Sequence, residues 1–393
     1  MKIKNLFPIM GLVFIASSLS LTSCSNNDDP ITPDPDPVPT ELAFAGSETC
    51  ATCHQDKYDM FIESGHPYKL NKVVDGNEPE IPWHDLGYIQ LPQGKTWADV
   101  TYMIGGYGWK ARWLDSNGYI MTDNNSNDDT QFNMADGTQV GYSTSHAMGT
   151  KPYDCGKCHT TGWKSTDDGG AHQDGLEGIA GEFFAGGVHC EECHGMGNIH
   201  TVTTEESDIH VDKTSELCGR CHTRNADRSI AASGGFIKHH EQYDEWLTSS
   251  HNANNVGCID CHDPHASVKY DDKALGQGVT KACTDCHSTF NADNHGGAQL
   301  ECITCHMPKA SKSAIKTGDY KGDIKTHIFN INAAADGKLF NAEGTVANPE
   351  GLGMSLDYVC YQCHKDVNGL GGSQSTKTME QLSAKATNFH GTK

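Results

Sequence analysis

Cysteine and histidine carry the clearest chemical pattern in this sequence of 393 residues. Sixteen of the 17 cysteines form eight Cys-x-x-Cys pairs, and a histidine directly follows each pair. Two thiols at this spacing can form thioethers to the vinyl groups of one haem, and the adjacent imidazole then supplies an iron ligand. A disulfide scaffold or a zinc ribbon also uses Cys-x-x-Cys, but neither needs the histidine. The pattern therefore predicts a c-type cytochrome with eight covalently bound haem c groups.

The eight motifs supply the predicted cofactor-binding and proximal metal-binding residues. The cysteines are Cys50, Cys53, Cys155, Cys158, Cys190, Cys193, Cys218, Cys221, Cys258, Cys261, Cys283, Cys286, Cys302, Cys305, Cys360 and Cys363. The proximal iron ligands are His54, His159, His194, His222, His262, His287, His306 and His364.

Fourteen further histidines could supply a second, distal ligand to each iron, with an ordinary surface histidine as the alternative for any one of them. An internal repeat singles out two. Residues 58–66 and 243–251 share the pattern aromatic-x-x-aromatic-x-x-Ser-x-His. Aromatic residues three apart lie on one face of a helix, so each copy predicts a short helix that packs on a haem. We therefore predict His66 and His251 as distal ligands.

Residues 46–245 resemble the small tetrahaem cytochrome that accepts electrons from hydroxylamine oxidoreductase. The resemblance lies in Ser64-Gly65-His66, Gly162-Trp163, Gly187-Val188-His189 and His240-Glu241-Gln242-Tyr243, each placed beside a haem motif in the family's order. It implies that His240 ligates the first haem, His200 the third and His66 the fourth. The family's second haem lacks a distal ligand. Here His146 precedes Cys155 by nine positions, and we predict that it fills this place, although it could equally serve a neighbouring haem.

The C-terminal half resembles the shared core of the pentahaem nitrite reductases and octahaem hydroxylamine oxidoreductases. The matching segments are residues 258–265, Met307-Pro308-Lys309 after the seventh motif, and residues 326–329 before the last motif. The resemblance implies three more distal ligands, His265, His295 and His327. His390 is a reserve candidate.

The composition suggests what these sites are built on. Only 36% of the residues are hydrophobic and 42 are glycine, so apolar side chains alone are too few for an ordinary core of this size. Residues 109–121 alternate around Asn117-Gly118, which predicts a β-hairpin, with Trp109 and Trp113 on one face packing against haem. The predicted fold class is mainly α with much irregular structure and a small β-hairpin, a multihaem cytochrome c fold organised around closely packed haems.

The N-terminus predicts export. Lys2 and Lys4 precede an apolar run, and residues 21–24 resemble a bacterial lipobox, which implies cleavage before Cys24 and its acylation. A plain secretory peptide is the alternative. The predicted parts are 1–23, a lipoprotein signal peptide; 24–44, an acidic Pro-rich tether; 45–232, an N-terminal tetrahaem region; and 233–393, a C-terminal tetrahaem region. We expect an exported lipoprotein on the periplasmic or cell-surface face of a membrane.

The formal net charge of −22 makes nucleic acid an unsuitable partner, since binding it needs clustered Lys and Arg. An acidic surface favours redox partner proteins with basic docking surfaces. We therefore predict an electron-transfer protein of the periplasm or cell surface. The alternative is a reductase or oxidase of small nitrogen or sulfur compounds at one open haem, although the Cys-x-x-Cys-Lys motif that marks the nitrite reductases is absent. A scaffold for adhesion or haem storage has no positive feature behind it.

Overall fold

The computed structural model describes residues 38–82, 86–124, 126–270, 277–290, 295, 300–387 and 389–390. Chain contacts divide the protein into Met1–Val38 and Pro39–Lys393, and everything below concerns the second unit. The predicted signal peptide, Cys24 and most of the predicted tether lie outside the described residues. Helix accounts for 24% and strand for 16% of the structure. Irregular chain therefore predominates, as predicted, but helix is not the main component.

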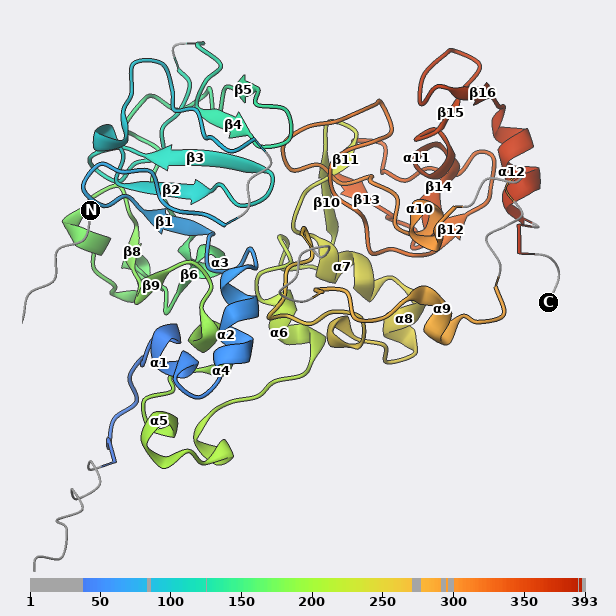
Figure 1. Cartoon of the computed structure of the whole chain (residues 1–393). Helices are drawn as coiled ribbons and strands as arrows, with labels where there is room; N and C mark the ends of the chain where they lie inside the picture. Colours follow the sequence, from blue (N-terminus) through green and yellow to red (C-terminus); the bar gives the residue numbers. More distant parts are fainter. Residues whose placement is uncertain are drawn as a thin grey trace, which may run out of the picture. The chain divides into compact units, whose positions relative to one another are not determined.

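The largest regular element is a five-stranded antiparallel sheet in the order β1-β2-β3-β4-β5 (Figure 1). Its strands are β1 (Leu70–Lys72), β2 (Tyr102–Gly105), β3 (Lys110–Leu114), β4 (Gln131–Asn133) and β5 (Gln139–Val140). The predicted hairpin is only a small part of it, because the turn at residues 117–118 is closed by a single bridge between Leu114 and Ile120. Trp113, predicted to pack against haem, is fully buried in an apolar cluster with Met103 and Phe132.

The remaining strands are short and are scattered along the chain. They form the pairs β6 (Thr160–Thr161) with β9 (Ala185–Gly186), β7 (Lys164–Ser165) with β8 (Gly181–Glu182), β12 (Ile331–Asn332) with β14 (Met354–Ser355) and β15 (His364–Lys365) with β16 (Gln374–Thr376). A three-stranded sheet joins β11 (Phe236–Ile237), β10 (Ile230–Ser233) and β13 (Val346–Ala347). Strand β10 spans residues 232 and 233, where the boundary between the tetrahaem regions is predicted, and that boundary stays a prediction.

Short helices carry most of the haem-attachment motifs. They are α1 (Ser47–Ala51), α2 (Gln55–Ile62), α3 (Gly156–His159), α4 (Cys190–His194), α5 (His200–Thr203), α6 (Ser215–Gly219), α7 (Gln242–Leu247), α8 (Ser250–Ala253), α9 (Cys283–Cys286), α10 (Cys302–His306), α11 (Leu356–Cys360) and α12 (Met379–Thr387). The fifth motif begins in a 3₁₀ turn, η5 (Cys258–Asp260). None of the helices in the described ranges is long and apolar enough to cross a membrane.

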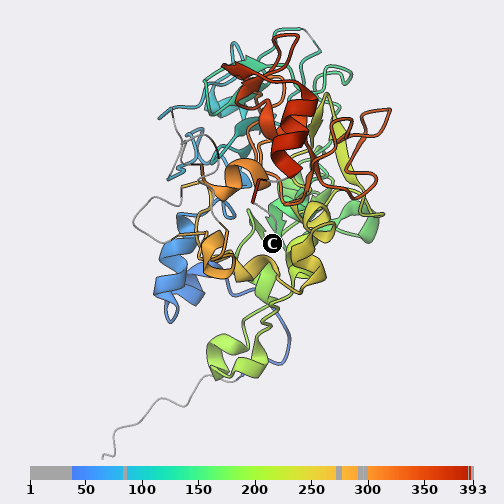
Figure 2. The ribbon, with the colours of Figure 1, turned by 90° about the vertical axis from the view of Figure 1, so that its right-hand side faces the viewer.

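The helices of the central motifs lie between the sheet and the C-terminal elements. Figure 1 shows α6 and α7 between the five-stranded sheet and the group formed by α11, α12 and β15–β16. The α5 segment lies at the opposite end of the ribbon from β15–β16 in both views (Figures 1 and 2). A second apolar cluster, which includes Ile237, Ile328 and Met354, packs under the C-terminal strands. The haem motifs are therefore held by loops and short helices anchored to several separate apolar clusters.

Candidate haem-binding sites

Six of the eight proximal histidines face a second imidazole ring at a nearly constant distance. A bond from a metal to an imidazole nitrogen is about 2 Å, so two rings that bind opposite faces of one iron have centroids about 6 Å apart. The observed centroid distances are 6.4 Å for His54 and His200, 6.3 Å for His194 and His265, 6.2 Å for His262 and His327, 6.1 Å for His287 and His251, 5.9 Å for His306 and His390, and 5.8 Å for His364 and His295. These residues fit six irons with two imidazole ligands each.

The hydrogen bonds of these rings also indicate that the rings are metal ligands. The Nδ1–H groups donate to backbone carbonyls, at 2.9 Å from His194 to His210, 3.0 Å from His262 to Gly278, 2.8 Å from His306 to Phe329, 3.0 Å from His364 to Ser375 and 2.9 Å from His200 to Glu205. A carbonyl can only accept, so each ring carries its proton on Nδ1 and keeps the Nε2 lone pair for a metal. His265 differs, because its Nδ1 donates to the Asp263 carboxylate at 2.8 Å.

Cysteines of different motifs lie against one another. None of the sixteen motif cysteines forms a disulfide within the described part of the chain. The thiol of Cys190 contacts that of Cys50 and raises its pKa, and Cys258 does the same to Cys218. The backbone supports both contacts, since the Cys190 N–H donates to Ser47 Oγ at 3.4 Å and the Cys258 N–H donates to Ser215 Oγ at 3.0 Å. Motifs one and three, and motifs four and five, therefore form two similar units, in which the thioether edges of two haems would be adjacent.

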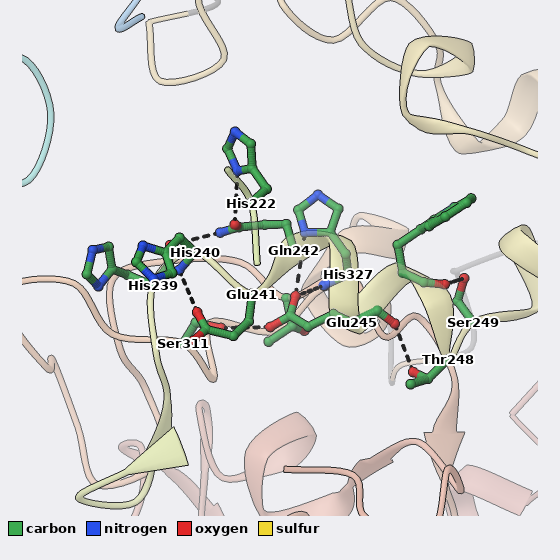
Figure 3. Close-up of polar contacts among 12 residues, drawn as sticks. His222, His239, His240, Glu241, Gln242, Glu245, Thr248, Ser249, Ser311 and His327 are labelled. Carbon is green, nitrogen blue, oxygen red and sulfur yellow. Dashed lines mark hydrogen bonds and ion pairs between the residues drawn. The ribbon is translucent and has the colours of Figure 1, made fainter. Parts of the chain in front are cut away.

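Helix α7 links the ligands of neighbouring motifs (Figure 3). The Nδ1 of His222 donates to Gln242 Oε1 at 3.2 Å. The Glu245 carboxylate accepts the backbone N–H of His327 at 2.6 Å and lies 3.7 Å from its ring Nδ1 (Figure 3). Glu241 is fully buried and pairs with Arg224 at 2.8 Å. This one buried helix therefore positions histidines that belong to two motifs.

The internal repeat is confirmed as a pair of helices, α2 and α7. His251 follows the second copy and faces His287. His66 follows the first copy, and its pKa is lowered to about 3 by burial and by the charges of Lys69 and His222. His66 is therefore a close neighbour of His222, as the resemblance implied, although the two rings do not stand at the spacing of the six pairs.

The structure pairs other histidines differently from the resemblance. His200 was expected to serve the third haem, but its ring faces His54 of the first motif. His194 of the third motif faces His265 instead. His240, expected at the first haem, lies against the neighbouring ring of His239 at 4.6 Å. These partners come from loops far apart in the sequence, so motif order alone could not assign them.

Two further histidines lie elsewhere than expected, and their roles as ligands stay predictions. His390, only a reserve candidate, faces His306. His146, predicted to close the second haem, is exposed, and its Nδ1 bonds Ser143 Oγ at 2.8 Å. It does not face His159, because residues 143–149 form a surface turn. Within the described part of the chain, no imidazole faces His159 at the spacing of the six pairs.

Basic side chains gather near His159 instead. The pKa of His159 is lowered to about 4 by burial and by the charges of Lys69, Arg112 and Lys110. Lys110 is itself half-buried, and burial together with the charge of Arg112 lowers its pKa to about 7. The pKa of His240 is lowered to about 3 by burial, Arg224 and His159. We call Lys69, Lys110 and Arg112, whose charges lower the pKa of His159, the basic cluster. It was not predicted from the sequence, although Lys110 and Arg112 share one face of β3.

The partners of Lys110 and Arg112 are neutral. Lys110 Nζ donates to the Ser313 carbonyl at 2.8 Å. Arg112 Nε donates to Gln131 Oε1 at 2.9 Å, and its guanidinium lies 3.5 Å from the centroid of the Tyr142 ring. Neither cation forms an ion pair among the described residues. The basic cluster can therefore accept a small anion beside His159.

Comparison with known proteins agrees with this geometry. The family model "Doubled CXXCH motif" matches residues 251–292, and the model "Cytochrome c554 and c-prime" matches residues 120–195. Taken with the motifs and the histidine pairs, these matches define the chain as a multihaem c-type cytochrome with covalent haem c at multiple Cys-x-x-Cys-His motifs.

Individual relatives refine this class. The chain is similar to the dissimilatory sulfite reductase MccA of Wolinella succinogenes, with 24% identity over 78% of this chain and 57% of the relative. It is also similar to the multihaem cytochrome MtrA of Shewanella baltica, with 27% identity over 32% of this chain and 37% of the relative. The chain thus spans little more than half, or less, of these relatives' length.

Solved structures show the same fold. The octahaem sulfite reductase MccA of Wolinella succinogenes matches 89% of this chain and 67% of its own, with a TM-score of 0.53 and 19% identity. The outer cell wall cytochrome OcwA matches 88% of this chain and 87% of its own, with a TM-score of 0.52 and 15% identity. At these identities the likeness concerns the fold alone, which is that of multihaem cytochromes with much irregular structure.

Proposed function

We propose that the chain is a membrane-anchored octahaem c-type cytochrome that transfers electrons between redox partners in the periplasm or at the cell surface. The six facing histidine pairs carry this proposal. Two imidazoles on one iron leave no axial position for a substrate, so such a site serves electron exchange. Acylation of Cys24 would supply the anchor.

The chain's own residues give this proposal its physical content. Haem supplies reversible one-electron chemistry when it is bound. The cysteines fix each ring at one edge, and backbone carbonyls hold the imidazoles in the tautomer that presents Nε2. The serines Ser47 and Ser215 keep neighbouring motifs in contact. Electron transfer falls steeply with distance, so contact between motifs is what a conducting chain requires.

Two measurements test the carrier. Intact mass spectrometry of the mature protein should show eight haem additions and the acyl chains of Cys24. The Cys24→Ser variant should keep its haem and leave the membrane fraction. A correctly matured protein with six or fewer haems contradicts the octahaem proposal, and a Cys24→Ser variant that stays with the membrane contradicts the anchor.

A second function is favoured by the site at His159. We propose that this site reduces a small anion, with the electrons supplied through the rest of the protein. His159 has no facing imidazole among the described residues, and the basic cluster lies beside it. Lys110 and Arg112 would hold and orient the anion by charge-assisted hydrogen bonds in a buried setting, where such bonds are strong. The resemblance to a sulfite reductase supports this reading.

Carbon monoxide separates the two functions. The dithionite-reduced protein should change its Soret spectrum on addition of carbon monoxide if the His159 site is open. In a separate sample without carbon monoxide, sulfite or nitrite should reoxidise the protein. A spectrum that carbon monoxide leaves unchanged means that every iron is closed. That outcome removes the reductase and leaves the carrier.

A further inference from the structure

A small pocket opens beside the last two haem-attachment motifs. Its volume is about 170 Å³. Ile303 and Thr304 line it, and both lie between the cysteines of the seventh motif. Gln362, between the cysteines of the eighth motif, lines it as well. The pocket therefore touches the loops that hold two haems at their thioether edges.

Three lysines converge on this pocket, and we call it the lysine pocket. Lys309, Lys321 and Lys325 line it, together with one carboxylate, the exposed Glu301. Burial and then the charges of Lys321 and Lys325 lower the pKa of Lys309, which shows that like charges crowd here. Such crowding is unfavourable unless an anion relieves it. The chain as a whole has a net charge of −22, whereas the lining of this pocket carries three lysines and one carboxylate.

Nearby carboxylates form no ion pair with the three lysines, although the charge of Asp323 raises the pKa of Lys309 against the other effects. Asp319 pairs with Lys316 at 3.2 Å. Both oxygens of Asp323 accept backbone N–H groups, from residues 313, 314 and 315 at 2.6, 2.7 and 3.0 Å. Within the described ranges Lys309, Lys321 and Lys325 form no ion pair. Their charge is therefore available to a ligand.

Haem carboxylates are a poor explanation for these lysines. The propionates of a haem project from the edge opposite its two vinyl groups, whereas Ile303, Thr304 and Gln362 mark the thioether edge. The two motifs are also neighbours, because Cys305 and Cys360 pack against the same apolar cluster. A ligand in the lysine pocket would thus lie beside two thioether edges at once.

We propose that the lysine pocket binds the phosphate or carboxylate group of a small anionic redox molecule that exchanges electrons with the protein at the seventh and eighth motifs. The inference rests on the proposed electron-transfer function. A water molecule occupies about 30 Å³ of liquid, so the pocket admits an anionic head group and leaves the redox ring outside. In the transfer, two ferrous haems become ferric, and the acceptor ring takes two electrons with two protons from solvent.

Riboflavin and its 5′-phosphate, flavin mononucleotide, form a matched pair of probes because they share the redox ring and differ in the phosphate. The dithionite-reduced holoprotein is mixed with each flavin at low ionic strength, and haem oxidation is followed by stopped flow. We expect the phosphate to accelerate oxidation by about tenfold, and salt to remove the advantage. The Lys309→Gln/Lys321→Gln/Lys325→Gln variant should oxidise equally with both flavins.

A charge-matched control carries Lys95→Gln, Lys164→Gln and Lys338→Gln, three exposed lysines outside the pocket. It should keep the phosphate advantage. Inorganic phosphate should also broaden in ³¹P spectra with the wild-type and control proteins and not with the pocket variant. Equal rates for both flavins in wild-type protein, or an advantage that survives in the pocket variant, overturns the lysine pocket alone.

Two further outcomes are distinct. Oxidation by neither flavin overturns the electron-transfer function, whatever phosphate does. Haem midpoint potentials that change in the pocket variant and not in the control would assign the lysines to haem carboxylates and overturn the pocket. Unchanged potentials with a lost phosphate advantage support it.

Discussion

The His159 site and the six paired sites solve the same local problem in opposite ways. At each paired site a second imidazole closes the coordination axis, with centroids 5.8 to 6.4 Å apart. At His159 the chain instead places Lys110 and Arg112, whose hydrogen-bond partners are a carbonyl and an amide. Lys110 and Arg112 are half-buried, and taking a cation out of water is costly without a negative partner. The difference teaches that the paired sites supply both axial ligands from the protein, whereas the described residues leave the two cations beside His159 without a negative partner.

The largest expected effect tests the comparison between the His159 site and the paired sites directly. Carbon monoxide should bind the reduced wild-type protein at the His159 site, and the His200→Gly variant should add one further site, because the iron at His54 loses the facing ring. Difference spectra under carbon monoxide measure both. The His146→Ala variant is the control and should behave like wild type, since His146 is an exposed surface residue. A carbon monoxide signal that appears only on removal of His146 would restore it as a ligand.

The next effect concerns the anion. Replacing Lys110 or Arg112 with Met should lower the rate of anion reduction by about 10²-fold, the usual cost of losing one buried charge-stabilising donor. Steady-state assays with nitrite or sulfite and a dithionite-reduced dye measure it. Lys164→Met is the control, because Lys164 is exposed and outside the basic cluster. Variants that retain full activity would remove the basic cluster from the reaction.

The same cluster predicts a pH dependence. The pKa of Lys110 is lowered to about 7, so this lysine is charged below that pH and neutral above it. Nitrite stays an anion on both sides of pH 7, and its affinity for the oxidised protein should therefore fall as the pH rises through about 7. Binding titrations between pH 6 and pH 9, monitored by haem absorption, measure the profile. The Lys110→Met variant should give a flat profile.

A smaller effect separates one paired site from the others. His265 donates to the Asp263 carboxylate rather than to a backbone carbonyl, and such a bond makes the imidazole a stronger donor to ferric iron. Asp263→Asn should therefore raise one midpoint potential by about 60 mV, a tenfold change for one electron. Lys57 lies 3.6 Å from Asp263, so the Lys57→Met variant should lower the same midpoint potential. The control is Asp56→Asn, because Asp56 is exposed and lies away from the ligand His265. This variant should leave the redox titration unchanged.

The smallest effect tests what holds the paired motifs together. Ser47→Ala and Ser215→Ala each remove the acceptor of a cysteine N–H, and each should lower the free energy of unfolding by about 1 kcal/mol. Denaturant titration of the holoprotein measures the change. Ser207→Ala, at an exposed position, should cost nothing measurable. Equal stability of all three variants would mean that the haems alone keep the motifs in contact.

The parts of this molecule that depend on short spacing could be predicted from the sequence. The motif cysteines and proximal histidines follow from adjacency, and the helices α2 and α7 from a local repeat. The partner of each proximal histidine could not be predicted, because His54 and His200 meet through tertiary folding. Only a hairpin of the five-stranded sheet was predicted, for the same reason: β1 pairs with β2 across about thirty residues of intervening chain.

The basic cluster left a signal that went unused. Lys110 and Arg112 are two apart on a strand, and residues at that spacing share one face. Their neighbours Ala111 and Trp113 are fully buried on the other face. Alternation of cations with buried apolar residues on one strand could have marked this face as a site. The position of this face beside His159 could not have been deduced, because helix α3, which carries His159, lies some fifty residues further along the chain.

The two serine links show how little the contact between two motifs depends on the chain that joins them. Ser47 with Cys190 and Ser215 with Cys258 join equivalent positions of two motif pairs. In the later pair, only the short helix α8 lies between α7 and η5. In the earlier pair, the five-stranded sheet and the second motif lie between α2 and α4. The same serine contact therefore tolerates a long insertion, because it depends on two local hydrogen-bonding groups and not on the length of the connecting segment.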